Sequence, residues 1–171
     1  MELKEAIKKR SSVRKYQDIP VERELIEEFL YYANLAPSAG NLQARDFIIV
    51  EDREIKKKLA FASYNQKFIE EAPVVVVFCA NLKRISPYGE RGKNFYVLQD
   101  VACAVQNFLL VAVEKGLSTC WVGAFNDEEV KKILNLPSWV RPVAIVPVGY
   151  GDEKSKTDRI DIEKLIHYGR W

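Results

Sequence analysis

The 171-residue chain has little of what several classes of functional site require. It contains one histidine, His167, and three cysteines that form no CxxC pair. A single imidazole argues against a histidine-rich metal site and disfavours a Ser-His or Cys-His nucleophile pair. An odd number of widely spaced cysteines fits a reducing compartment better than secretion. We therefore expect a cytoplasmic protein without a metal centre.

The sequence also has no long hydrophobic run and no excess of charge of one sign. The N-terminus, MELKEAIKKR, mixes charged and apolar residues, and the longest apolar run, PVVVVFCA at 73–80, is far shorter than the ~18 residues of a membrane span. Twenty-six Lys and Arg against 24 Asp and Glu leave a net charge of +2, and the basic residues are spread along the chain. These observations predict neither a membrane anchor nor a nucleic-acid interface.

The glycine-rich phosphate loops of common nucleotide-binding folds are missing as well. There is no GxGxxG motif and no Walker loop, and the only glycines in GxG spacing, Gly149 and Gly151, precede the acidic Asp152 and Glu153. A separate dinucleotide site of the Rossmann type is therefore not expected.

What the chain does have is the composition of one globular domain, which we assign to residues 1–171. Its residues are 48% hydrophobic and 29% charged, and its length lies within the roughly 100 to 200 residues of a typical domain. A chain of this size buries about 70% of its unfolded surface, so it needs no disulfide or metal to form a core.

Hydrophobic spacing predicts the order helix, helix, strand, helix, strand, helix, strand, helix, strand, hence an α/β layered (α+β) domain with a central mixed sheet flanked by helices. The expected helices lie at about 3–10, 21–34, 97–113 and 127–134, with a further helix that begins after Asp52 and carries Ile55 and Leu59 on its apolar side. The expected strands lie at 46–51, 73–81 and 141–150, with a strand and its exit loop at 118–125. Asp52 and Asn126 are predicted N-caps, the latter in a capping box with Glu129. Gly116 is the predicted stop of the long central helix.

The first of three polar segments that packing alone does not explain is Arg10-Ser11-Ser12-Val13-Arg14. Its guanidinium groups and hydroxyls could hold a phosphate. The ordinary alternative is that Arg10 binds the last carbonyls of the first helix while Arg14 is solvated.

The second segment is Pro37-Ser38-Ala39-Gly40-Asn41-Leu42-Gln43. Small residues and glycine permit close approach to a flat ligand, and the uncharged amides of Asn41 and Gln43 could recognise an imide edge such as that of a flavin. A helix stop followed by a loop would explain the same residues.

The third segment, Thr119–Phe125, is a predicted strand that opens into a turn at Val122-Gly123-Ala124. Backbone N–H groups at such a turn could face a ring that gains electron density on reduction. Alternatively, Trp121 and Phe125 are core residues and Gly123 is an ordinary turn residue.

In this order and spacing, the three segments resemble the nitroreductase family of FMN-dependent oxidoreductases. The resemblance extends over essentially the whole chain and is carried by RSSVRKY at 10–16, APSAGNLQARDFIIV at 36–50, YVLQDVACAVQNFLLVAVEKGLSTCWVGAF at 96–125 and HYGRW at 167–171. The chain departs from the family at Ala44-Arg45, where Pro-Trp is common, and in its short length, which leaves no room for lid insertions.

The resemblance implies a nitroreductase-like fold, FMN as cofactor and NADH or NADPH as reductant. It implies FMN-binding roles for Arg10, Ser11, Ser12, Arg14, Pro37, Ser38, Ala39, Asn41, Gln43, Val122, Gly123, Ala124, Lys156 and Arg159. The residues of 37–43 would act largely on the flavin of a neighbouring subunit. No catalytic side chain is required, since the flavin carries out the hydride chemistry.

Two further expectations follow for function and assembly. The enzyme would transfer a hydride from NAD(P)H to a nitroaromatic, quinone or similar small acceptor by a ping-pong mechanism. A flavin-binding store or redox sensor without turnover is the alternative. The apolar tail, 160–171, has no obvious place on one domain, and we expect a homodimer whose tails wrap around the partner.

Overall fold

The computed structural model describes residues 1–151 and 157–171, and its centre is a sheet with the strand order β1-β2-β4-β3. The strands are β1 (Arg45–Val50), β2 (Val74–Asn81), β3 (Ser118–Thr119) and β4 (Val140–Gly149). Neighbouring strands in this order are antiparallel. Parallel pairing, expected for a mixed sheet, is confined among the described residues to one isolated bridge, between Ser12 and Thr119. That bridge brings the N-terminal polar segment to the edge of the sheet.

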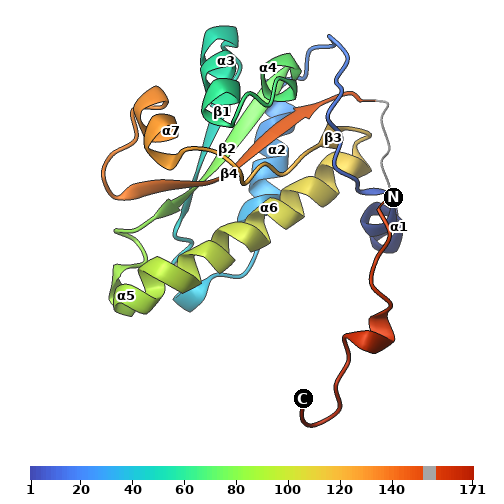
Figure 1. The fold of residues 1–171 in the computed structure, drawn as a ribbon, viewed down its shortest axis with the longest axis vertical. Coiled ribbons are helices and arrows are strands. Elements are labelled where there is room, and N and C mark those ends of the chain that lie inside the picture. Colours follow the sequence, from blue (N-terminus) through green and yellow to red (C-terminus); the bar gives the residue numbers. More distant parts are fainter. Residues whose placement is uncertain (152–156) are drawn as a thin grey trace.

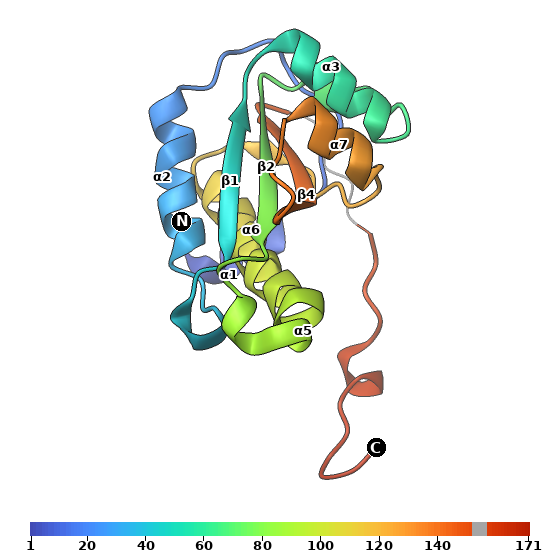
Figure 2. The same cartoon turned by 90° about the vertical axis from the view of Figure 1, so that its left-hand side faces the viewer.

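Helices cover both faces of the sheet, as Figure 2 shows. The helices are α1 (Leu3–Lys9), α2 (Arg23–Asn34), α3 (Arg53–Ala62), α4 (Phe68–Glu71), α5 (Gly89–Arg91), α6 (Val97–Glu114) and α7 (Asp127–Ile133). Short turns lie at Ala39–Asn41, Ser86–Tyr88 and Ile162–Lys164, and Gly92–Tyr96 is a π-helix that leads into α6. The predicted elements occur in the predicted order, and the short helices α4 and α5 are additional elements that were not predicted.

The alternation of side chains along β2 divides the core into two clusters. Val76 and Phe78 pack with α2 and α6 on one face, whereas Val75 and Val77 pack with α3 and α7 on the other. Because successive strand residues point to opposite faces, a strand covered on both sides is apolar at every position. This explains the uninterrupted run PVVVVFCA.

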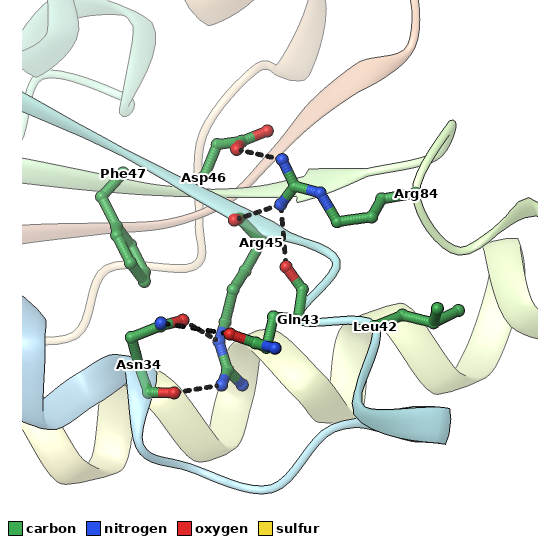
Figure 3. Close-up of a pocket in the computed structure, with 7 residues that line it drawn as sticks. All are labelled: Asn34, Leu42, Gln43, Arg45, Asp46, Phe47 and Arg84. Carbon is green, nitrogen blue, oxygen red and sulfur yellow. Dashed lines mark hydrogen bonds and ion pairs between the residues drawn. The ribbon is translucent and has the colours of Figure 1, made fainter.

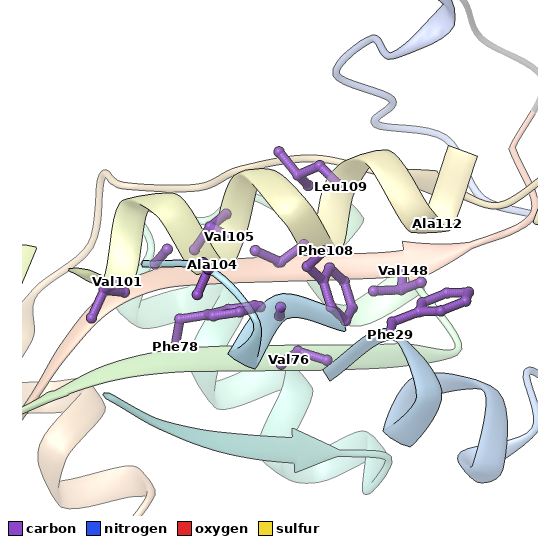
Figure 4. Packing of buried hydrophobic residues seen from close by; sticks show 14 of the residues in the cluster. Phe29, Val76, Phe78, Val101, Ala104, Val105, Phe108, Leu109, Ala112 and Val148 are labelled. Atoms are coloured by element: carbon purple, nitrogen blue, oxygen red, sulfur yellow. The ribbon is translucent and has the colours of Figure 1, made fainter. Parts of the chain in front are cut away.

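The long helix α6 is the main element of the first cluster (Figure 4). The ring of Phe108 meets Phe29 of α2 at a centroid distance of 5.7 Å and Phe78 of β2 at 5.3 Å, both edge to face. By length and composition, the helical run from Ser86 to Glu114 would also suit a membrane span. Its buried stripe against the sheet accounts for its apolar character here, as in the core helix of a globular domain.

The helix ends confirm most of the predicted signals. The Asp52 carboxylate accepts the Ile55 N–H at 2.8 Å, and α6 stops before Gly116, which has a φ of +79°. The Asn126 side chain accepts the Glu129 N–H at 3.1 Å. The reciprocal half of the predicted capping box is not formed, because the Asn126 N–H donates to the carbonyl of Ala62 at 2.8 Å.

The strand and exit loop predicted at 118–125 are both present, and the strand, β3, already ends at Thr119. After Thr119 the pairing with β4 weakens at Pro147, which has no N–H to donate, and one further bridge joins Val122 to Ile145. The chain beyond Val122 is therefore free to form the exposed turn at Gly123 and Ala124.

The C-terminal tail, residues 157–171, runs away from the body of the domain (Figure 1). Ile160 is 67% exposed and Trp171 is fully exposed. Most of the hydrophobic surface of Ile160 and Trp171 is therefore exposed, although the Trp171 ring stacks on that of His167 at a centroid distance of 4.2 Å.

Candidate functional site

A cationic pocket of about 650 Å³ lies beside the C-terminal end of α1. It is lined by Ile7, Lys8, Arg10, Ser11, Ser12, Arg14, Thr157 and Arg159. The described residues that line it include four cations and no carboxylate. The structure thus places the 10–14 segment and Arg159 of the tail around one pocket. Lys156, predicted for the same role, lies outside the described residues.

The polar segment is held in place by the sheet edge. The Val13 N–H donates to the Thr119 carbonyl at 3.0 Å, and the Tyr16 hydroxyl donates to the Val13 carbonyl at 2.8 Å. Val13 itself is buried, so the residues on either side of it point outward. The Arg14 guanidinium lies 5.9 Å from the ring centroid of Phe68.

Two titratable groups behind this segment are kept neutral by burial. Burial raises the pKa of the Tyr16 phenol, with a smaller contribution from Cys120. It also raises the pKa of the Cys120 thiol, against the opposing influence of Arg14 and a hydrogen bond to Ser12. Because Tyr16 and Cys120 stay neutral, they do not offset the positive electrostatic potential of the arginines.

The turn at Val122-Gly123-Ala124 lies on the same edge of the sheet. Val122 is buried, and its N–H and carbonyl both pair with Ile145 at 2.9 Å. Gly123 and Ala124 are exposed, and the Ala124 carbonyl accepts from the Gln66 side chain at 3.1 Å. Within the described residues, the N–H groups of Gly123 and Ala124 have no hydrogen-bond acceptor. They are two preformed donors for a ligand.

The segment 37–43 forms a tightly turned loop at the other end of α6. Gly40, Asn41 and Gln43 all have positive φ values, between +47° and +55°. The Ser38 hydroxyl accepts the Gln43 N–H at 3.0 Å, and the Ala39 N–H donates to an Asp100 carboxylate oxygen at 2.9 Å. These bonds hold an otherwise strained loop in one conformation.

A second pocket, of about 480 Å³, lies beside this loop (Figure 3). It is lined by Asn34, Leu42, Gln43, Arg45, Asp46, Phe47 and Arg84. The Gln43 side chain donates to the Asn41 carbonyl at 3.1 Å, and Arg84 donates to the Gln43 carbonyl at 2.8 Å. The amides predicted to recognise a ring therefore lie at the surface in a fixed arrangement, next to an open pocket.

One protomer does not bring the two parts of the predicted site together. The 37–43 loop is anchored to Asp100 in the first turn of α6, whereas α1 lies near its last turn, where the N-terminal amine is 3.5 Å from Glu114. At 1.5 Å per residue, these two positions are separated by roughly 20 Å along the helix axis. Figure 1 shows α1 and α5 at opposite ends of α6.

Sequence reasoning missed two residues that position the loop, Arg45 and Asp100. Arg45 is 3% exposed, and its guanidinium donates to the carbonyls of Asn34, Ala36, Pro37 and Asp100 and to the Asn34 side chain. Asp100 is 4% exposed, and its second carboxylate oxygen has no partner among the described residues. Helical spacing could have found Asp100, because it falls on the same face as Val97, Val101 and Ala104.

The chain is similar to known proteins of one family. Residues 7–66 and 60–150 match the model of the Nitroreductase family. The chain is 33% identical over 175 residues to a protein of Methanothermobacter thermautotrophicus named as an NADH dehydrogenase/NAD(P)H nitroreductase, with 100% of this chain and 88% of that protein covered. It is 30% identical over 173 residues to the FMN reductase [NAD(P)H] of Bacillus subtilis, covering 91% of this chain and 69% of that one.

The fold is likewise found among solved structures. NfrA2 of B. megaterium matches with a TM-score of 0.92 at 27% identity, covering 100% of this chain and 76% of that chain. The family model covers most of the sequence, including the 10–14 segment, the 37–43 loop and the 122–124 turn. The chain belongs to the nitroreductase family.

Proposed function

We propose that the chain is an FMN-dependent NAD(P)H oxidoreductase that passes a hydride to a nitroaromatic, quinone or similar small acceptor. The observation that carries the proposal is the cationic pocket, in which Arg10, Arg14 and Arg159 converge from distant parts of the sequence. A phosphate monoester carries nearly two charges at neutral pH, and guanidinium groups bind such an anion through paired N–H donors.

The chain offers hydrogen-bonding groups for both ends of FMN, the phosphate and the flavin ring. Ser11 and Ser12 lie among the arginines as hydroxyl partners for the phosphate. The free N–H groups of Gly123 and Ala124, on the same sheet edge, can donate to the polar rim of the flavin ring. Bound FMN supplies the redox chemistry by accepting two electrons and a proton from NAD(P)H and passing them on.

We further propose that the site is completed by a second copy of the chain in a cytoplasmic homodimer. Pro37, Ser38, Ala39, Asn41 and Gln43 lie too far from Arg10 to act on the same flavin within one protomer. An arrangement in which α6 packs against its twin in the opposite direction would bring each loop to the partner's cationic pocket. The exposed tail would then cover the partner.

The reaction balances without a side-chain base. NAD(P)H and one proton reduce a quinone to a hydroquinone, or a nitro group to a nitroso group with release of water, and NAD(P)⁺ is formed. The role of the protein is to hold the cofactor, to neutralise its phosphate and to donate hydrogen bonds to the ring as its electron density increases.

The decisive experiment is to purify the protein and follow its flavin. We expect a yellow protein with about one FMN per chain, which NADH or NADPH bleaches rapidly and a quinone or nitroaromatic recolours. A flavin store without turnover would hold FMN but would not be bleached. A colourless protein that does not bind added FMN would contradict the proposal entirely.

A further inference from the structure

The segment between β2 and α6 carries a group of four residues that the proposed flavin site does not use: Tyr88, Arg91, Phe95 and Tyr96. The Arg91 guanidinium lies 5.0 Å from the ring centroid of Phe95 and 5.3 Å from that of Tyr96. Its Nε donates to the Tyr96 hydroxyl at 2.9 Å. The side chain is therefore held by two rings and one hydrogen bond, although it lies at the surface.

The outer end of this guanidinium is free to bind a ligand. Among the described residues, neither of its terminal amino groups has a hydrogen-bond partner. The neighbouring Glu90 carboxylate is engaged by Lys93 at 3.2 Å and by the Asn94 amide at 3.3 Å. A second arginine, Arg141, donates at 3.2 Å to the carbonyl of Lys93, two residues along the chain from Arg91. The patch around Arg91 therefore carries a net positive charge.

The same cluster touches the loop that we assign to the flavin ring. Tyr88 packs edge to face on Tyr96, with ring centroids 5.5 Å apart. Its hydroxyl lies against Gly40, where a Cβ atom would come within 2.5 Å of the hydroxyl oxygen. Arg91 is thus connected to the 37–43 loop through two aromatic rings. Figures 1 and 2 place α5 next to the turn that follows α2.

We infer that Arg91, held by Phe95 and Tyr96, is a specificity-determining residue that selects acceptors bearing a carboxylate on an aromatic ring. A guanidinium with both terminal amino groups free matches a carboxylate through two parallel hydrogen bonds. The exposed rings of Phe95 and Tyr88 offer a stacking surface for a flat acceptor. The inference rests on the proposed function, because that proposal places the 37–43 loop at the flavin.

The test compares two acceptors of equal shape, 4-nitrobenzoate and 4-nitrobenzamide, with the FMN-loaded protein. In Arg91→Gln we expect kcat/KM for 4-nitrobenzoate to fall about tenfold and that for 4-nitrobenzamide to change less than about twofold, since one charge-assisted contact is lost. Arg91→Lys should give an intermediate loss, because it keeps the charge without the planar fork. Arg53→Gln is the matched control, an exposed arginine on α3 at the far end of the molecule.

A binding measurement separates recognition from turnover. Calorimetry should show that benzoate binds the FMN-loaded wild type about tenfold more tightly than it binds Arg91→Gln, whereas benzamide should not distinguish the two. Equal changes for both nitro compounds, or no change for either, would overturn the inference while leaving the oxidoreductase intact. A protein that does not bind FMN, or is not reduced by NAD(P)H, would instead remove the proposed function on which the inference rests.

Discussion

Arg45 and Arg10 differ in burial, and we expect them to have different roles. Arg45 is almost fully buried, and burial lowers the pKa of its guanidinium, an effect that the nearby Asp100 partly opposes. All five of its N–H donors bind oxygens of the chain. Arg10, by contrast, is half-buried and lines an open pocket. The first organises the fold around the 37–43 loop, and the second is available to a ligand.

Replacing Arg10 by Ala should weaken FMN binding selectively. Loss of one charge-assisted contact to the phosphate corresponds to roughly 1.5 to 3 kcal/mol, or about ten- to a hundredfold in Kd. Riboflavin lacks the phosphate and should bind wild type and variant alike, as fluorescence titration can measure. If riboflavin binding fell by the same factor, Arg10 would be supporting the fold and not the phosphate.

Replacing Arg45 by Met should destabilise the protein without touching the cationic pocket. The change leaves four backbone carbonyls near α2 and α6 without their donor, and unpaired buried acceptors cost about 1 to 3 kcal/mol each before relaxation or entry of water. We expect urea unfolding to show a loss of about 3 kcal/mol. Arg53→Met, on the exposed face of α3, is the matched control. A loss below about 1 kcal/mol for Arg45→Met would mean that the loop is held chiefly by Asp100.

At the scale of the elements, α6 connects the core to both parts of the site. Its buried face packs on α2 and β2, its first turn anchors the 37–43 loop through Asp100, and its last turn lies beside α1. The length of α6 therefore fixes the distance between the 37–43 loop and the cationic pocket beside α1.

The Phe108→Ala variant tests how much this helix depends on its aromatic contacts. Phe108 is fully buried and contacts the rings of Phe29 and Phe78 edge to face. Removing a ring of this size from a packed core typically costs 3 to 5 kcal/mol, measurable as a shift of the urea midpoint. Phe61→Ala, at a position 67% exposed on α3, should change stability by less than about 0.5 kcal/mol. Similar losses in both variants would contradict this account of the core.

The elements were predictable from the sequence to the extent that their signals are local. Periodicity along Val97–Val113 and the cap at Asp52 were sufficient for α6 and α3. An exit from the third strand within 118–125 was predicted, but its position after Thr119 was not, because it depends on Pro147 in a strand that follows in sequence. The second half of the Asn126 capping box failed for a similar reason, since the carbonyl of Ala62 competes for the same N–H.

The three segments of the candidate site were predictable from the sequence. The buried residues that hold these segments in place were not. Resemblance to a family identified residues 10–14, 37–43 and 122–124, yet Arg45 was noticed only as a departure from that family. Its role requires the carbonyls of α2 and α6, which only the tertiary fold brings to it. The same is true of Arg91, whose aromatic partners give no motif.

At the scale of the whole molecule, we expect both redox partners to use one place. No dinucleotide fingerprint is present in the sequence, so the nicotinamide and the acceptor would use the same flavin face in turn. We expect initial-rate plots against NAD(P)H at several acceptor concentrations to be parallel, and excess acceptor to compete with the nicotinamide. Intersecting lines would show a ternary complex and would require a second binding site.

The last prediction concerns the tail and the assembly together. Residues 160–171 are exposed throughout, and they include Ile160, Ile162, Leu165, Ile166 and Trp171. Hydrophobic surface of this extent on one segment is typical of a protein contact. If the tail wraps a second copy whose 37–43 loop completes the flavin site, deletion of 160–171 should cause dissociation and loss of FMN at the same time. Arg159 remains in the truncated chain, so the pocket keeps its arginines.

Sedimentation velocity and flavin absorbance, measured on the same sample at micromolar concentration, distinguish the possible outcomes. The full chain should be a dimer with two FMN, because obligate interfaces usually bury more than about 2,000 Å² and leave no stable monomer. A control that replaces only Tyr168 by Ser removes one exposed ring and should keep the dimer. A full-length chain that sediments as a folded, FMN-loaded monomer would refute the shared site, because within one chain the anchor of the 37–43 loop and the end of α6 beside α1 are about 20 Å apart along the helix axis.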